Sequence, residues 1–180
     1  NGINFFDKAE AYANGKSEIL MGKILKKTKW PRDSYIISSK VFWGGEFPTQ
    51  RGLSKKHIHD ACNLALKRLQ IDYLDLYFCH RPDPETPIEE TVYAMNDLIQ
   101  QGKILYWGTS EWSATEIDYA FQVSDKFNFT LKLKDVFDTG GFSIMTGQTL
   151  ETVGNYEVYP PIYSVNYNKL EEYLDAEHRR

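Results

Sequence analysis

The fold is decided by residues 74–108, which read LDLYFCHRPDPETPIEETVYAMNDLIQQGKILYWG. Residues 74–79 and 104–108 are mainly apolar and aromatic, so each of these runs predicts a strand. Between them, Thr86-Pro87-Ile88-Glu89 predicts a helix start, with a capping threonine, a proline at the first helical position and a capping-box glutamate. Gly102 marks the end of that helix. The stretch therefore predicts a strand, a crossover helix and a second strand parallel to the first.

The same alternation extends toward the N-terminus. Residues 3–7 and 35–41 each predict a strand, and residues 17–28 between them predict a helix that Ser17 caps. After the second strand, Ser54 caps a further helix, whose apolar positions recur every three or four residues at Ile58, Ala61, Cys62, Ala65, Leu66 and Leu69. Two more βα units thus precede the deciding stretch.

A fourth unit follows, because Ser113-Ala114-Thr115-Glu116 is a capping box that predicts a helix to about Lys126. Strict alternation predicts a parallel sheet covered by helices, either an open doubly wound sheet or a (β/α)8 barrel. Neither G-x-G-x-x-G nor G-x-x-x-x-G-K-[ST] occurs, which disfavours the open sheet. We therefore expect an α/β fold of the (β/α)8 TIM-barrel type. A complete barrel takes about 250 residues, so we expect an incomplete one of four to five βα units.

The C-terminal third departs from this pattern. Residues 1–128 form the predicted barrel portion, whereas residues 129–159 show neither a helical nor a strand period and predict an atypical insertion or a disordered segment. Residues 160–180 begin with Pro160-Pro161 and predict a resumed barrel strand followed by a short helical tail.

Composition excludes several classes of partner. The 180 residues carry a net charge of −4, with basic and acidic residues intermixed, so we expect no nucleic-acid binding. The longest apolar runs are far shorter than the roughly 20 residues of a membrane span. The two cysteines, Cys62 and Cys79, fall on a predicted helix face and a predicted strand. They are more simply reduced core residues than a disulfide, so we expect a cytoplasmic protein.

The candidate chemistry lies where the predicted strands end, because barrels of this class place their working groups there. The four strand ends offer Asp7, Lys40, His80 and Ser110, and Tyr12 lies in the loop after the first strand. An Asp, a Tyr, a Lys and a His from successive strand ends can converge on one pocket. Such a set predicts proton transfer to a carbonyl oxygen.

Each member of this set has a plausible role in proton transfer. An ammonium near a tyrosine stabilises the phenolate and makes the phenol a stronger acid, so Lys40 is a candidate partner of Tyr12. Asp7 would keep that ammonium charged in an apolar barrel mouth, and His80 could orient the carbonyl oxygen. Alone, each side chain is more simply a loop cap, a surface aromatic, a solvated strand end or a core histidine. Together they favour a catalytic tetrad.

Ordered motifs support this interpretation. Residues 4–12, NFFDKAEAY, are similar to the aldo-keto reductase signature, and Lys40 and His80 follow at the separations of that family's tetrad. Four further segments resemble the potassium-channel β-subunit branch of the family: KVFWGG at 40–45, GLSKKHI at 52–58, HRPDP at 80–84 and YWGTSEW at 106–112. The resemblance covers residue 1 to about residue 128.

The resemblance implies an NADP(H)-dependent oxidoreductase that reduces aldehyde or ketone carbonyls by hydride transfer, with Tyr12 as general acid. It further implies cofactor contacts from Asp7, Lys40, Ser110 and Glu111, and a substrate pocket lined by Trp43. The sequence departs from the family at Glu111, where an Asn or Arg often follows the serine, and this puts the carboxamide contact in doubt.

Alternatives to a reductase remain open. Mammalian channel β-subunits carry Asn in place of His80, so His80 favours an enzyme here. The motifs specific to the channel β-subunit branch are also consistent with a regulatory module that binds a channel, or with a homo-oligomer. An inactive truncated fragment is the third possibility.

The remaining conspicuous residues have structural interpretations. We expect packing roles for Trp107 and Trp112. We expect exposed helix positions for His57, His59 and His178. No His, Cys, Asp or Glu cluster has metal-ligand spacing, so we expect no metal.

Overall fold

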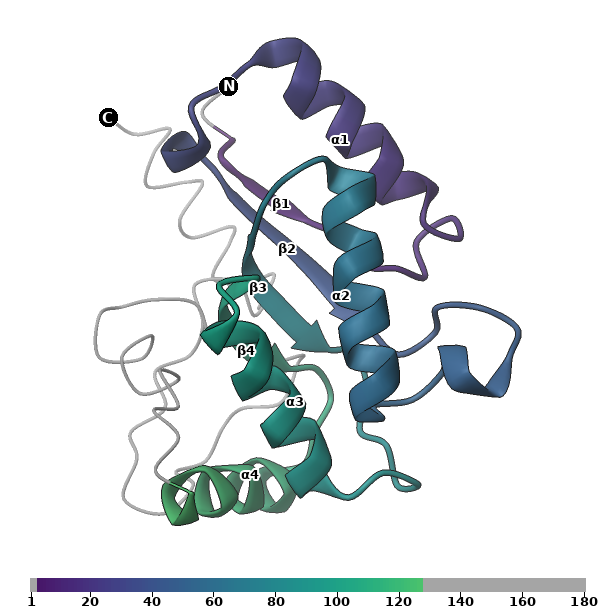
Figure 1. Cartoon of the computed structure of the whole chain (residues 1–180), viewed down its shortest axis with the longest axis vertical. Helices are drawn as coiled ribbons and strands as arrows, with labels where there is room; N and C mark the ends of the chain where they lie inside the picture. Colours follow the sequence, from purple (N-terminus) through teal and green to yellow (C-terminus); the bar gives the residue numbers. More distant parts are fainter. Residues whose placement is uncertain (1–2, 128–180) are drawn as a thin grey trace, which may run out of the picture.

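The computed structural model describes residues 3–127, which form four consecutive βα units (Figure 1). The strands are β1 (Phe5–Asp7), β2 (Ile36–Val41), β3 (Leu74–Cys79) and β4 (Ile104–Thr109). The helices are α1 (Lys16–Thr28), α2 (Lys55–Leu69), α3 (Ile88–Gln100) and α4 (Ala114–Lys126). Two short 3-10 helices, η1 (Arg32–Ser34) and η2 (Pro48–Gln50), lie beside β2 along the chain.

The four strands pair in parallel and in sequence order, β1-β2-β3-β4. A doubly wound sheet would reverse its strand order at a switch point, and no such reversal occurs in residues 3–127. Successive helices pack against each other in the same order, α1 on α2, α2 on α3 and α3 on α4 (Figure 1). This is the arrangement of one segment of a (β/α)8 barrel, as the alternating sequence pattern predicts.

The core lies between the strands and their helices. All four βα units contribute buried side chains to this core, and one face of α2 is prominent among them. The fully buried side chains include Ile37, Ile58, Leu69, Leu74, Met95, Leu98 and Ile104. Cys62 and Cys79 are both buried and free, as expected for reduced core residues. Trp107 and Trp112 also lie in this core, so the prediction that they are packing residues is confirmed.

Two of the predicted helix caps are confirmed. The Ser54 side chain accepts a hydrogen bond from the His57 amide at the start of α2. Ser113 and Glu116 form a reciprocal capping box on α4. Gly102 ends α3 with a φ of +68°, a left-handed conformation that favours glycine.

The other two caps are wrong, for local reasons. Helix α1 begins at Lys16 after a left-handed turn at Gly15, so Ser17 already lies inside the helix and caps nothing. Helix α3 begins at Ile88 without a side-chain cap, because Pro87 occupies the N-cap position and Thr86 lies one residue too early; the Thr86 hydroxyl donates to Asp83 at 2.7 Å. Proline and the loop geometry are sufficient to start this helix.

The histidine predictions also need correction. His57 is buried rather than exposed, with 3% of its surface accessible, because its ring turns inward to contact Gly52 and Glu10. His59 is partly buried beside Asp97. The predictions for residues 129–159, for residues 160–180 and for His178 lie outside the described residues.

Within residues 3–127, no helix is both long and apolar enough to cross a membrane. In the same range, His, Cys, Asp and Glu side chains form no group of three or more placed to hold a metal ion.

The packing of α1 on α2 generates a stability prediction. Gly22 of α1 is buried against α2, where an added Cβ would lie 2.8 Å from the carbonyl oxygen of Leu69. We expect Gly22→Ala to destabilise the protein by about 1–3 kcal/mol through overpacking, although alanine is the better helix former. Denaturant unfolding would measure this, with exposed Lys23→Ala as the control. A stabilised Gly22→Ala variant would contradict the close contact.

Candidate active site

The predicted site residues come from one edge of the sheet. Asp7 ends β1, Lys40 is the penultimate residue of β2, and His80 and Ser110 directly follow β3 and β4. Backbone hydrogen bonds continue past the strands, with the His80 amide donating to Val41 at 3.0 Å and the Ser110 amide to Cys79 at 2.9 Å. Because the strands are parallel and in register, these side chains leave the sheet at the same end.

The Lys40 ammonium lies at the centre of the site. It is only 6% exposed, and it forms an ion pair with the Asp7 carboxylate. It also donates to the Lys8 carbonyl at 3.1 Å and to the Tyr12 phenol oxygen at 3.3 Å. Asp7 is further held by the Ser38 hydroxyl, which donates to its other carboxylate oxygen at 2.5 Å. A buried cation is thus paired with a carboxylate and directed at a phenol.

Three aromatic rings form the open side of this cluster. The Tyr12 and His80 rings meet edge to face with centroids 6.0 Å apart, and the His80 and Trp43 rings do so at 5.1 Å. Tyr12 and Trp43 are each about two-fifths exposed, whereas His80 lies between them at 9%. The phenol and the indole are therefore accessible to solvent, and the imidazole lies buried beside both of them.

The electrostatic environment keeps His80 neutral at physiological pH. Burial, together with the positive charges of Lys40 and Arg81, lowers the pKa of His80 to about 4. Its Nδ1 atom is buried and has no hydrogen-bond partner among the described residues. A neutral imidazole can donate one hydrogen bond and accept another, but it supplies no proton as an imidazolium would.

Ser110 and Glu111 are linked by Arg81. The Arg81 guanidinium donates to the His80 carbonyl at 2.6 Å and lies 3.4 Å from the Ser110 hydroxyl. Its Nε atom pairs with Glu111 at 3.0 Å, and the guanidinium also lies over the Trp43 ring, 5.4 Å from its centroid. Glu111 adopts a left-handed backbone conformation, with φ +59°. The carboxylate that departs from the family pattern is therefore engaged by an arginine on the neighbouring loop.

The structure thus brings Asp7, Tyr12 and Lys40 into direct contact and places His80 against the Tyr12 ring. Sequence reasoning missed two participants, Ser38 and Arg81. Ser38 precedes Lys40 by two positions in a strand, so the twofold period puts both side chains on the same face and could have identified it. Arg81 stands beside His80 in the chain, but its contacts with Glu111 and Trp43 carry no signal in the sequence.

Comparison with known protein families gives a clear result. The sequence profile described as "Aldo/keto reductase family" matches residues 1–146. Two relatives are proteins named "Probable voltage-gated potassium channel subunit beta". The one from Arabidopsis thaliana is 52% identical over 128 residues, and the one from Oryza sativa subsp. japonica is 50% identical over 127. Each match covers 71% of this chain and 39% of the relative, so the chain spans about two-fifths of their length.

Solved structures agree with the family match. An aldo-keto reductase from Klebsiella pneumoniae, determined in complex with NADPH, is 35% identical and superposes with a TM-score of 0.55. The match covers 66% of this chain and 37% of that enzyme. The sequence pattern, the strand order and this similarity all support the same barrel architecture.

The environment of His80 can be tested by titration. We expect its imidazole resonances to move with a midpoint near 4, so that the ring is still neutral at about pH 5.5. The pKa of His80 in the folded protein, about 4, lies below the unfolded value of about 6.5, so protonation of His80 favours the unfolded chain. The stability of the protein should therefore fall as the pH drops from about 6.5 to about 4.

Removing a positive charge gives the matched comparison. Lys40→Met is expected to raise the His80 midpoint only partway toward 6.5, because burial is the larger cause and persists. Lys126→Met, on the last turn of α4, serves as the control. A His80 midpoint at or above 6.5 in the unmodified protein would refute this account of the site.

Proposed function

This chain belongs to the aldo/keto reductase family, and from that we propose an NADP(H)-dependent oxidoreductase that reduces aldehyde or ketone carbonyls. The observation that carries the proposal is the position of Lys40, whose ammonium contacts the Asp7 carboxylate and the Tyr12 phenol oxygen together. In this geometry the Lys40 ammonium can stabilise the phenolate that forms when Tyr12 releases its proton.

Tyr12 is the general acid in this mechanism. As charge develops on the carbonyl oxygen of the substrate, the phenol donates its proton to that oxygen. The phenolate left behind lies beside the Lys40 ammonium, which stabilises it, and Asp7 holds that ammonium in place. Solvent can reprotonate Tyr12 after product leaves, because its side chain is exposed at the mouth.

His80 has a different role from Tyr12. With its pKa lowered to about 4, it is neutral at physiological pH and is a poor source of a proton. A neutral imidazole beside Tyr12 and Trp43 can instead donate a hydrogen bond to the carbonyl oxygen and orient it toward Tyr12. The exposed ring of Trp43, packed against His80, would line the pocket for the rest of the substrate.

The residues present fit the nicotinamide end of NADP(H), which the Klebsiella relative contains as NADPH. Ser110 is 5% exposed, and its hydroxyl accepts from Arg81, so its own proton can bind a carboxamide oxygen. Asp7 and Lys40 would border the same group. Glu111 fits less well, because its carboxylate is paired with Arg81. When bound, the cofactor supplies the hydride that adds to the carbonyl carbon.

A regulatory binding role is the second candidate. It is supported by the 52% identity to the Arabidopsis protein named as a potassium-channel subunit beta, and it is compatible with catalysis at the same time. A cytoplasmic location suits either role and is supported by the two free, buried cysteines. Co-purification with the cytosolic part of a potassium channel from the same organism would test it, and an inactive protein that still binds would favour the regulatory role.

The catalytic proposal predicts the effect of removing one oxygen atom. We expect Tyr12→Phe to lower kcat/KM for carbonyl reduction by about 10²–10⁴-fold, because the general acid is lost while the ring remains. NADPH binding, followed by quenching of tryptophan fluorescence, is expected to persist in the variant. The rate of NADPH oxidation with a panel of aldehydes measures the catalytic effect.

The control is Tyr119→Phe, an identical change at an exposed tyrosine that bonds Glu89 between α3 and α4. It is expected to leave the rate unchanged. Equal activity of the Tyr12→Phe variant and the parent protein would exclude Tyr12 as the acid.

A further inference from the structure

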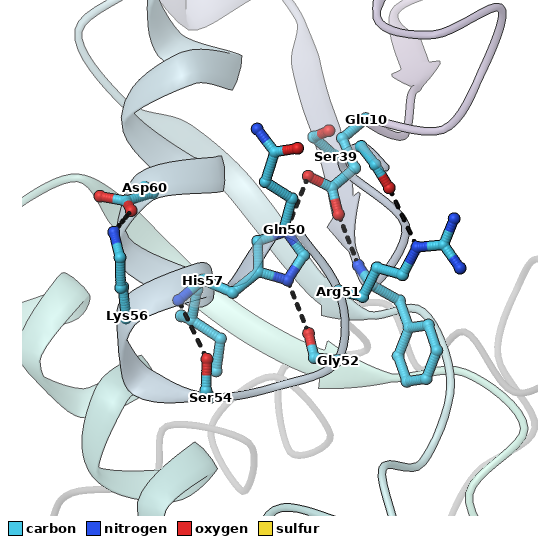
Figure 2. Close-up of polar contacts among 12 residues, drawn as sticks. Glu10, Ser39, Gln50, Arg51, Gly52, Ser54, Lys56, His57 and Asp60 are labelled. Atoms are coloured by element: carbon cyan, nitrogen blue, oxygen red, sulfur yellow. Dashed lines mark hydrogen bonds and ion pairs between the residues drawn. The ribbon is translucent and has the colours of Figure 1, made fainter. Parts of the chain in front are cut away.

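A second acid–base pair lies buried behind the proposed active site. Glu10 belongs to the loop after β1, and His57 belongs to the first turn of α2; only 4% and 3% of their surfaces are accessible. Figure 2 shows the two side chains facing each other between the sheet and the helix. Neither contributes to the cluster around Lys40, and the proposed reaction does not use them.

Glu10 fixes the start of the loop that carries Tyr12. Its amide donates to the Lys40 carbonyl at 3.1 Å, and its carboxylate accepts from the Phe42 amide at 2.6 Å. The residue is thus bound to the end of β2 on both sides of Val41. Tyr12 follows two positions later, in a turn closed by its amide on the Ala9 carbonyl at 3.1 Å. The path of this loop determines how far the phenol lies from the Lys40 ammonium.

His57 fixes the hairpin that carries Trp43. Its Nδ1 atom lies 2.9 Å from the Gly52 carbonyl oxygen, and the Gly52 amide donates to Phe42 at 2.9 Å across the base of the hairpin. Trp43 is the first residue of that hairpin and forms a bridge with Arg51. The ring of His57 is therefore attached to the closing strand of the segment that presents the indole to His80.

The two halves meet at Gly44. A Cβ at this position would lie 2.6 Å from the Glu10 carboxylate and 2.8 Å from Nε2 of His57, so the hairpin passes directly over the pair. Only the absence of a side chain at Gly44 allows this approach. The loop of Tyr12, the hairpin of Trp43 and the start of α2 are consequently packed around one buried contact.

The contact itself is incomplete as a hydrogen bond. Nε2 of His57 lies 3.4 Å from the Glu10 carboxylate, within ion-pair distance, yet it is not aligned for a hydrogen bond with any described residue. Burial alone would lower the pKa of His57, but the Glu10 carboxylate, together with backbone hydrogen bonds to Gly52 and Arg51, more than offsets it, and the net shift is upward.

Other charged groups near the ring are directed elsewhere. Lys56 and Asp60 pair with each other on the exposed face of α2, and the Arg51 side chain donates to the Gly45 carbonyl at 3.0 Å. Among residues 3–127, Glu10 is therefore the charged group that faces the imidazole (Figure 2). Protonation of His57 converts the contact into a buried ion pair.

We propose that Glu10 and His57 are positioning residues for the carbonyl reduction described above, and that their pairing sets the Tyr12 loop and the Trp43 hairpin in the arrangement needed for proton transfer. The inference rests on the proposed function for its catalytic consequence. The two residues act through Tyr12 and Trp43 and touch no reacting atom.

The kinetic test uses Glu10→Gln, which keeps an acceptor for the Phe42 amide but removes the charge, and His57→Gln. We expect each to lower kcat by about 10- to 100-fold through misplacement of the acid, and the double variant to lose little more than either single one. The parent pH profile is expected to show an inflection above about 6.5 that both variants lack, because the raised folded pKa means the ion pair is present at lower pH and lost as pH rises.

The matched control is Asp75→Asn at the opposite end of the sheet. This carboxylate likewise accepts from a backbone amide, that of Ile37 at 2.8 Å, and pairs with a cation, Arg32, at 2.6 Å. We expect the control to lose stability while its kcat and pH profile stay unchanged. Variants of Glu10 and His57 that behave like Asp75→Asn would overturn the positioning role.

A second readout separates failure of this inference from failure of the proposed function. In protein labelled with carbon-13 tyrosine and fluorine-19 tryptophan, the Tyr12 and Trp43 resonances, assigned with Tyr12→Phe and Trp43→Phe, should both follow the titration of His57. That response should vanish in Glu10→Gln. If both resonances follow His57 in a protein that reduces no carbonyl, the pair positions these loops and only the catalytic proposal fails. If neither resonance moves, the positioning role is excluded whatever the activity.

Discussion

The structure of the site depends on the buried ammonium of Lys40. An ammonium taken out of water costs several kcal/mol unless an opposite charge and hydrogen bonds compensate. Here the compensation comes from Asp7 on the neighbouring strand, and the Ser38 hydroxyl fixes the second oxygen of that carboxylate. The parallel register of β1 and β2, which pairs Asp7 with Ser38, brings these groups together. The same ammonium donates to the Lys8 carbonyl at 3.1 Å, and its third N–H bond is directed at the Tyr12 phenol oxygen at 3.3 Å.

Much of the fold could be predicted because its signals are local. Each strand begins with apolar residues, each helix has an apolar face, and the strands pair in parallel in sequence order. Errors arose at individual side chains. Thr86 does not cap α3, because the helix begins one residue later than expected and Pro87 occupies the N-cap position. His57 could face solvent or the interior. It faces the interior, where it contacts the Glu10 carboxylate from the loop after β1, which is far away in the sequence.

The site was predictable to the extent that it depends on strand ends. Asp7, Lys40, His80 and Ser110 all follow from the rule that such barrels carry their chemistry at the carboxyl ends of the strands. Contacts made by the loops were beyond the same reasoning. They depend on left-handed residues such as Ala13, Asn14 and Glu111, whose backbone conformations are set by the folded surroundings. The pairing of Arg81 with Glu111, and its stacking on Trp43, exist only because those loops turn as they do.

Two nearby carboxylates, Asp7 at the end of β1 and Glu10 in the loop that follows, face different charged groups. Asp7 faces the Lys40 ammonium on one side of the sheet, and Glu10 faces the His57 imidazole on the side covered by α2. An ammonium carries its charge throughout the physiological range, whereas an imidazole gains or loses its charge within it. The loop that presents Tyr12 is therefore held by one constant and one pH-dependent attraction. In the proposed reaction, the Asp7–Lys40 pair lies beside the Tyr12 phenol, and the Glu10–His57 pair would set the position of the loop that carries it.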